Sequence, residues 1–144
     1  MNTSRKRKGK PASRIFLSYV GADRAYARKL RSLLSQRPNL RIFTTETLSA
    51  GEDWESKLKD ELSQSDIFIV LLSSNSIDSK WVLHELGAAW ALNKPIIPVA
   101  IHPEVFSRIP VALRELQLVE IKDLENPEVI DRILEGYEKA VNFT

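Results

Sequence analysis

Residues 67–72 read Ile67-Phe68-Ile69-Val70-Leu71-Leu72, a run of apolar side chains with no polar residue between them. A strand with one face in water alternates apolar and polar residues, whereas a strand covered on both faces is apolar throughout. The run is as long as an ordinary strand and short for a buried helix. It therefore predicts a central strand of a parallel sheet, with helices on both faces of that sheet.

The segments around this run alternate between strand and helix patterns. Residues 15–19 and 96–101 are short apolar strands, while residues 40–44 and 118–121 alternate as half-exposed strands do. The helical patterns are a helix capped by Asp23 that ends near Pro38, a helix with Trp54, Leu58 and Leu62 at four-residue intervals, a helix from about Ser79 to Asn93, and a final helix from Asn126-Pro127. Residues 103–116 are irregular, with a short helix at most.

Strands that alternate with helices form parallel sheets through right-handed crossovers. The first, third and fourth strands have buried patterns, and the second and fifth have edge patterns. This places the strands in the order 2-1-3-4-5, the flavodoxin-like doubly wound five-stranded sheet with helices on both faces. A ligand of such a sheet binds at the carboxyl ends of the strands, between strands one and three. The loops there are residues 18–23 and 73–76, with residues 45–53 able to fold over them.

Three residues carry specific expectations about packing. Pro98 has no backbone N–H, so it should lie near an end of its strand or at a bulge. Trp90 lies about half a turn around its helix from Trp81, and we expect it in the core. Trp54 is expected to anchor the second helix in the core rather than to contact a ligand.

Length and composition favour one folded domain behind a basic tail. The chain has 144 residues, which leaves no room for two cores. Residues 1–13 hold five of the 21 Lys and Arg residues and no acid, so the remainder has 16 basic residues against 19 acidic ones. We therefore divide the chain into a disordered tail, residues 1–12, and a domain, residues 13–144.

The same composition indicates where the protein acts and which partners are not expected. No apolar run approaches the roughly 20 residues of a membrane helix, and the basic amino terminus has no apolar stretch behind it. We expect a cytoplasmic protein without a membrane span. Nucleic acid is not an expected partner, except weakly through the basic tail.

Absent residues and motifs exclude several chemistries. The chain has no cysteine, which excludes disulfides, a thiolate nucleophile and cysteine-ligated metals. It has no phosphate-binding Gly-x-x-x-x-Gly-Lys loop, no Gly-x-Gly-x-x-Gly after the first strand and no Gly-x-Ser-x-Gly elbow. Ser18-Tyr19 and Ser73-Ser74 stand where a phosphoacceptor receiver needs carboxylates, and the two histidines lack metal-binding spacing. We expect no metal and no cofactor.

Glu85 is the residue that these exclusions leave. It lies in the nearly uniformly apolar stretch 81–92, where His84 is the only other ionisable residue. Trp81 lies one turn earlier on the same face, so an indole is beside the carboxylate. An aromatic ring and a carboxylate at the carboxyl edge of a sheet suit a flat heterocycle joined to a sugar. The alternative is structural, with Glu85 paired to an arginine or capping a loop.

From about Ser13 to Val141 the chain resembles the Toll/interleukin-1 receptor (TIR) domain family, and in particular its bacterial NAD-cleaving members. The resemblance rests on the order and spacing of these fragments: Arg14-Ile15-Phe16-Leu17-Ser18-Tyr19 with Asp23, Glu46-Thr47-Leu48-Ser49-Ala50-Gly51 with Trp54, Ser65-Asp66, Ser79-Lys80-Trp81-Val82-Leu83-His84-Glu85-Leu86 and Lys94-Pro95-Ile96-Ile97-Pro98-Val99. The family fold is the 2-1-3-4-5 sheet.

The resemblance implies an NAD+ nucleosidase that releases nicotinamide and ADP-ribose or a cyclic variant. It implies that Glu85 is catalytic, with NAD+ as the substrate, and that Ser18, Tyr19, Val20 and Gly21 of the first loop line its pocket. We add Thr44 at the end of the second strand, Ser74 at the crevice and Trp81 beside Glu85 as substrate-binding candidates. Thr44 stands where the family often has an acidic residue, and Ala50-Gly51 replaces a usual Pro-Gly.

The resemblance also implies self-association through TIR–TIR contacts and a role in defence or cell-death signalling. The covering loop would make these contacts with Glu46, Leu48, Ala50, Gly51 and Trp54. A sensor domain or partner protein would supply the trigger. Two other functions stay open: a non-catalytic interaction module, and an enzyme similar to nucleoside deoxyribosyltransferases, for which the expected paired acid is not evident.

Overall fold

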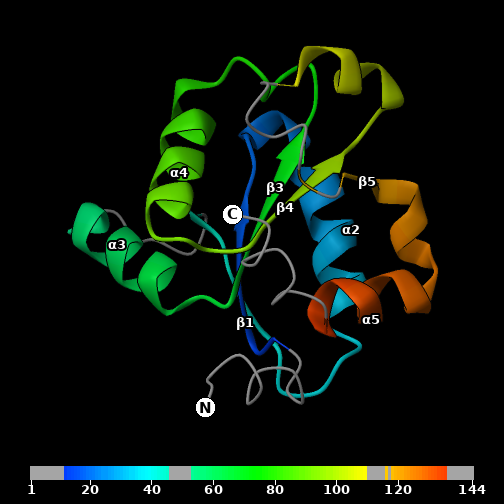
Figure 1. The fold of residues 1–144 in the computed structure, drawn as a ribbon, viewed down its shortest axis with the longest axis horizontal. Coiled ribbons are helices and arrows are strands. Elements are labelled where there is room, and N and C mark those ends of the chain that lie inside the picture. The colour runs from blue at the N-terminus through cyan, green and yellow to red at the C-terminus, as the bar shows by residue number, and fades with distance from the viewer. Residues whose placement is uncertain (1–11, 46–52, 110–115, 117, 136–144) are drawn as a thin grey trace.

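The structure is a computed structural model, and it describes residues 12–45, 53–109, 116 and 118–135 (Figure 1). Its elements in chain order are β1 (Arg14–Ser18), the 3-10 helix η1 (Gly21–Asp23), α2 (Arg24–Leu34), β2 (Arg41–Phe43), α3 (Trp54–Gln64), β3 (Ile67–Leu72), α4 (Lys80–Ala91), β4 (Ile96–Ala100), the 3-10 helix η3 (Pro103–Arg108), β5 (Val119–Glu120), the 3-10 helix η5 (Ile121–Glu125) and α5 (Pro127–Glu135).

The strands form one five-stranded parallel sheet in the order β2-β1-β3-β4-β5, which confirms the predicted topology. Every residue of β3 is buried, as its apolar run predicts for a central strand. β1 pairs with β2 and β3, and the ring of Phe16 lies 5.2 Å from that of Phe43 and 5.5 Å from that of Phe68. The aromatic rings therefore bridge the three strands on one face of the sheet.

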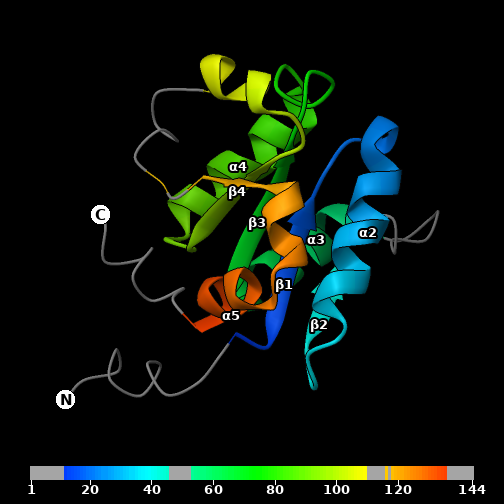
Figure 2. The same ribbon diagram turned by 90° about the vertical axis from the view of Figure 1, so that its right-hand side faces the viewer.

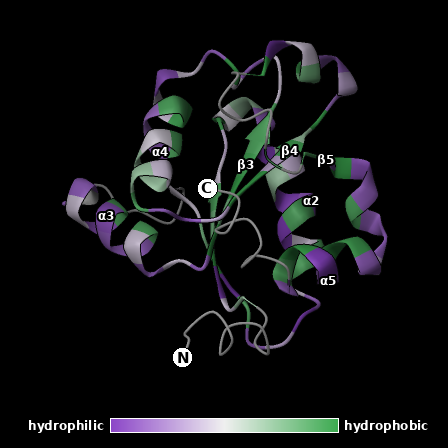
Figure 3. Ribbon diagram, viewed as in Figure 1, coloured by the Kyte–Doolittle hydropathy of each residue, from purple (hydrophilic) through white to green (hydrophobic). Residues whose placement is uncertain are grey.

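Helices cover both faces of the sheet, as predicted (Figures 1 and 2). Alternate residues of each strand point to opposite faces, so the one domain has an apolar cluster on each face of its sheet. Ile69 lies in the core with α2, η5 and α5, and its neighbour Val70 lies in the core with α3, α4 and η3. Figure 3 shows the apolar strands β3 and β4 between helices whose ribbons carry hydrophilic segments.

The expectation for Pro98 is wrong, because this residue is in the middle of β4 and pairs with Val70. The amide of Phe68 bonds to the carbonyl of Pro95, and the amide of Ile101 bonds to the carbonyl of Leu72. Backbone N–H groups alternate in direction along a strand, so the nitrogen of Pro98 faces away from β3. Pro98 therefore costs no hydrogen bond between β4 and β3. On its other side, β5 pairs with β4 only from Val99 onward.

The expectation for Trp90 is also wrong, because its side chain is 69% exposed. α4 buries Val82, Glu85, Leu86 and Ala89, which follow helical spacing along one face. Trp90 lies outside that face, on the same side of the helix as Leu83, which is two turns earlier and 43% exposed. A helix that is apolar all round does not reveal from its sequence which side faces the sheet.

Ala12 joins the folded domain, although the sequence places it in the tail. It is buried, and its amide donates a 3.0 Å hydrogen bond to the carbonyl of Leu134 in α5. Ala12 therefore packs with the domain, one residue before the expected boundary. Residues 1–11 of the expected tail lie outside the described residues.

Candidate functional site

The candidate site lies where β1 and β3 end side by side and the strand order reverses. Ser18 is the last residue of β1 and pairs in register with Val70 of β3. The hydroxyl of Ser18 donates a hydrogen bond to Oε1 of Glu85, which comes from α4. Both side chains are 1% exposed. The structure thus brings together two of the predicted site residues at the expected edge of the sheet.

The local sequence explains why Glu85 points inward. Ser79 caps α4 by accepting a 3.2 Å bond from the amide of Val82, which fixes the start of the helix. With the helix in this phase, Glu85 is on the same face as Val82 and Leu86. Apolar burial of those neighbours therefore carries the carboxylate to the end of β1.

Burial raises the pKa of Glu85 from 4.5 to about 7, because a low-dielectric environment disfavours the charged form. Hydrogen bonds from Ser18 and from the Trp81 side chain oppose this effect. Within the described part of the chain, no arginine or lysine forms an ion pair with Glu85, and Oε2 has no hydrogen-bond partner. The predicted alternative of an arginine partner finds no support among these residues.

Trp81 lies one turn before Glu85, as its spacing predicts, and it is half-buried. Its ring stacks on that of His84, with centroids 6.3 Å apart and planes 25° from parallel. His84 itself is exposed. The carboxylate is therefore flanked by an aromatic ring that is partly accessible, which is the arrangement expected for recognition of a flat heterocycle.

A second polar cluster joins the two loops at this edge of the sheet. Ser73 donates a 2.5 Å hydrogen bond to Oδ2 of Asp23, and Asn75 donates a 3.1 Å bond to Oδ1. Asp23 is 2% exposed. It occupies the cap position of α2 as predicted, but its side chain makes no capping bond. The carboxylate serves the neighbouring loop instead.

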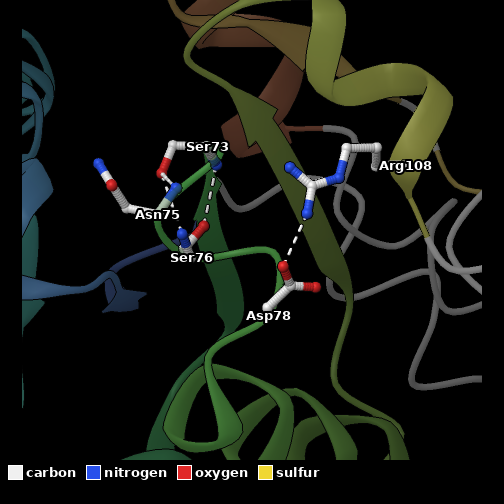
Figure 4. Close-up of polar contacts among 5 residues, drawn as sticks. All are labelled: Ser73, Asn75, Ser76, Asp78 and Arg108. Carbon is white, nitrogen blue, oxygen red and sulfur yellow. Dashed lines mark hydrogen bonds and ion pairs between the residues drawn. The ribbon is translucent and has the colours of Figure 1, made fainter.

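Figure 4 shows how the turn of residues 73–76 is held from within and from its far side. The hydroxyl of Ser73 accepts bonds from the amides of Asn75 and Ser76, at 3.0 and 3.1 Å. The Ser76 hydroxyl accepts from the amide of Ser73, at 2.9 Å. Beyond the turn, Arg108 of η3 forms a 2.7 Å ion pair with Asp78. Sequence reasoning named the two loops but missed the role of Asp23.

The other predicted pocket residues are distributed around this centre. Tyr19 is buried, Val20 is half-buried and Gly21 is exposed, in the loop that leaves β1. Thr44 follows β2 and is fully buried, whereas Ser74 is exposed on the 73–76 turn. The covering-loop residues Glu46, Leu48, Ala50 and Gly51 lie outside the described residues. Trp54 begins α3, and its side chain is likewise outside the description.

Glu85 lines neither of two hollows found elsewhere in the molecule. One, of about 560 Å³, is bordered by β5, η5 and α5, and the other, of about 100 Å³, lies near the start of β1 and β2. Within residues 12–45, 53–109, 116 and 118–135, no three acidic or histidine side chains converge to hold a metal ion. No helix in these ranges is both long and apolar enough to cross a bilayer.

Comparison with known proteins identifies relatives of this fold. The family model of the TIR domain matches residues 15–134. The TIR domain of the Toll-related receptor TRR-2 from Hydra magnipapillata is similar with a TM-score of 0.68 and 17% identity, over 87% of this chain and 97% of that one. The TIR domains of the activated Roq1 resistosome, which directly recognises the pathogen effector XopQ, are similar with a TM-score of 0.57 and 20% identity. The match covers 92% of this chain and 85% of that one.

A named enzyme shares the same fold. The CMP N-glycosidase BcmB of Clostridium botulinum is similar with a TM-score of 0.59 and 15% identity, over 81% of this chain and 99% of that one. No curated protein matches the chain at a significant level. At these identities the solved structures establish the fold, and the chemistry must be argued from the residues at the site.

Proposed function

The chain belongs to the TIR domain family, and from this membership we propose that it is an NAD+ nucleosidase in which Glu85 is the catalytic residue. The observation that carries the proposal is the placement of Glu85. Its carboxylate is buried at the end of β1, accepts a hydrogen bond from Ser18 and lies one helical turn from Trp81. An acid held this way at the ligand edge of the sheet fits a catalytic role better than a stabilising one, because burial of a carboxylate is costly.

The chemistry of NAD+ explains why one carboxylate suffices. Ordinary glycosidases use two, since the departing alcohol needs a proton. The nicotinamide ring of NAD+ already carries a positive charge and leaves as a neutral molecule when the C1–N bond breaks. Positive charge then develops on C1 and the ring oxygen of the ribose. Ionised Glu85 stabilises that charge and can accept hydrogen bonds from the ribose hydroxyls.

The reaction is completed by attack on C1 from the solvent side. Water forms the new C–O bond and loses a proton to solvent, which gives ADP-ribose and nicotinamide. Capture by a nucleophile within the nucleotide gives a cyclic product instead. We propose hydrolysis as the basic reaction, with cyclisation as a variant of the same step.

We propose that the buried position of Glu85 belongs to a resting state of the enzyme. At pH 7 a carboxyl group with a pKa of about 7 is roughly half protonated, and a 1% exposed side chain does not meet a substrate in solution. A bound cationic ring beside Glu85 would lower its pKa and favour the active form. We propose that self-association, together with the covering loop of residues 45–53, opens and completes the pocket.

The biological setting that we propose follows the family. The protein would act in the cytoplasm, in a defence or cell-death signalling pathway, and a sensor domain or partner protein would promote its self-association. The name of the Roq1 assembly, a resistosome with TIR domains that recognises a pathogen effector, is consistent with this setting.

One observation favours a second candidate function, a non-catalytic interaction module. α4 presents large apolar side chains to solvent, with Leu83 43% exposed and Trp90 69% exposed. Large apolar residues exposed on one side of a helix are typical of a contact surface. In this alternative the domain would associate with another TIR domain and turn over no substrate.

Incubation of the full chain with NAD+, followed by chromatographic quantification of nicotinamide, tests the proposal. We expect nicotinamide release by the wild type and a loss of about 10²–10³-fold in Glu85→Gln, which keeps the shape but removes the charge. Glu61→Gln in α3 is the matched control and should retain activity.

CMP supplied in a parallel reaction tests the substrate class, because an enzyme of that specificity shares the fold. Release of cytosine with NAD+ left intact would identify CMP, rather than NAD+, as the substrate. Equal nicotinamide release by Glu85→Gln would show that Glu85 is not the catalytic residue. No release by wild type at any protein concentration would favour the interaction module.

A further inference from the structure

We propose that Asp23 is a positioning residue of the nucleotide site, which locks the 73–76 turn against the loop that leaves β1. The inference rests on the proposed function, because it assumes that this edge of the sheet binds the substrate. Asp23 does not touch the reacting atoms in this account. It sets the distance and the angle between two loops that border Glu85.

The geometry of Asp23 is that of a clamp between the loops. Its two carboxylate oxygens accept separate bonds, Oδ2 from the hydroxyl of Ser73 at 2.5 Å and Oδ1 from the side chain of Asn75 at 3.1 Å. Its own amide bonds to the carbonyl of Val20 at 2.9 Å, which closes the loop on which it lies. Asp23 is therefore fixed to one loop by its backbone and to the other by its side chain.

The hydrogen bonds within the 73–76 turn determine that the Ser73 hydroxyl donates to Asp23. The hydroxyl of Ser73 accepts bonds from the amides of Asn75 and Ser76, which leaves its single proton for Asp23. The hydroxyl of Ser76 donates to the carbonyl of Leu71 at 2.9 Å, tying the turn to the end of β3. Because the turn is ordered internally, movement of Asp23 would shift it as one unit.

Asp23 is a buried carboxylate that hydrogen-bond donors of the neighbouring loop hold in place. Asp23 is 2% exposed, and no lysine or arginine within the described ranges forms an ion pair with it. Burying a carboxylate without a cation costs free energy that neutral residues of similar size would not. A carboxylate retained at this cost between two loops at the ligand edge points to a need for fixed loop geometry.

The clamp lies beside the proposed reacting group in the chain as well as in the fold. Asp23 follows Ser18 by five residues, and the 73–76 turn leads through Ser79 into α4 and Glu85. Ser18 bonds to Glu85, and Asp23 bonds to Ser73, so the same two segments are tied twice. The first tie holds the catalytic carboxylate, and the second holds the rim where Ser74 is exposed. Loss of the second tie should therefore affect substrate binding more than the chemical step.

The test compares Asp23→Ala and Ser73→Ala with a control on the same loop, Asp78→Asn, in the full chain. Asp78 is largely exposed and pairs with Arg108 at 2.7 Å on the far side of the loop. We expect Asp23→Ala to raise KM for NAD+ about tenfold or more, since hydrogen bonds to a charged group are individually strong, with kcat changed less than about threefold. Asp23→Asn, which keeps one acceptor oxygen, should fall between wild type and Asp23→Ala. Asp78→Asn should keep the wild-type KM.

The division between KM and kcat separates positioning from mere stabilisation. A variant that only unfolds part of the protein lowers the apparent kcat by the lost fraction and leaves KM unchanged. That result, or a wild-type KM in a well-folded Asp23→Ala, would overturn the proposal. If Asp23→Ala does not fold, Asp23→Asn decides, because it keeps the shape of the side chain and one acceptor oxygen while it removes the charge that Ser73 and Asn75 hold. A wild type that releases no nicotinamide would overturn the proposed function and this inference together, whereas active wild type with unaffected variants overturns this inference alone.

Discussion

The hydroxyl of Ser18 donates a hydrogen bond to the carboxylate of Glu85, and so joins the end of β1 to α4 across 67 residues of sequence. The bond lies at the point where the strand order of the sheet reverses, which is where open α/β sheets bind their ligands. It also acts on the ionisation of Glu85, because a donor to a carboxylate favours the charged form. Stability, acidity and the proposed chemistry are therefore linked at one contact.

Stability should fall as pH rises from about 4.5 to about 7. Glu85 has a raised pKa in the folded state, so between these values the folded protein binds more protons than the unfolded one. The contribution of Glu85 to the free energy of unfolding is fully present below pH 4.5 and is lost as pH rises through about 7. It amounts to roughly 3 kcal/mol. Glu85→Gln should be more stable than wild type above pH 7, and the difference should vanish near pH 4. Urea unfolding of both proteins between pH 4 and 8 measures it; parallel pH curves would show that Glu85 has an ordinary pKa.

Ser18→Ala should move the pH dependence of NAD+ cleavage to higher pH. The Ser18 bond lowers the pKa of Glu85, so its removal raises that pKa further and leaves less ionised carboxylate at pH 7. We expect reduced kcat/KM at neutral pH and partial recovery at pH 8 to 9. The pH profile of kcat/KM is the measurement, with Ser63→Ala on the surface of α3 as control. A uniform loss at every pH would show that Ser18 acts on the substrate and not through Glu85.

Deletion of residues 1–10 should leave the melting temperature unchanged, whereas deletion of residues 1–12 should lower it. The first deletion removes the basic segment and keeps Ala12, whose amide bonds to Leu134. The second removes that bond and a buried methyl group, at a cost of about 1 kcal/mol. Thermal unfolding of the two truncated proteins gives the comparison. A large loss of stability in the shorter deletion would show that the basic segment contributes to the fold.

The basic segment should also account for any affinity for nucleic acid. Binding to RNA, if it occurs, should disappear with residues 1–10 and should weaken steeply as salt is added.

The sequence was sufficient to predict the sheet order because the apolar or alternating pattern of each strand indicates how far that strand is buried. The uninterrupted apolar run of β3 places it in the centre, and the polar residues of β2 place it at an edge. The burial of Glu85 beside the end of β1 was also predictable, since a carboxylate in an apolar helix stands out, whereas its catalytic role stays a prediction. In both cases the signal is local and repeats with the period of the secondary structure.

The features that sequence reasoning missed depend on orientation or on distant pairing. Asp23 and Ser73 are 50 residues apart, and nothing in either loop indicates that their side chains meet. Trp90 is exposed because α4 presents another of its apolar faces to the sheet. Pro98 fits a central strand because its nitrogen faces away from β3. None of these properties has a period that a sequence pattern could reveal.

Specific activity should rise with protein concentration if assembly completes the pocket. Glu85 is 1% exposed in the single domain, so substrate access requires a rearrangement that a neighbouring molecule can supply. In a dilution series, we expect nicotinamide release per milligram to be highest at the highest protein concentration and to fall on dilution, in parallel with the mass measured by light scattering. Ala50→Arg in the covering loop should lower activity without lowering the melting temperature. Trp90→Arg alters the exposed face of α4 and should leave the fold intact, so it reports whether that face takes part. Constant specific activity over a range in which only monomer is present would contradict the assembly mechanism and indicate a hydrolase that is complete in one domain.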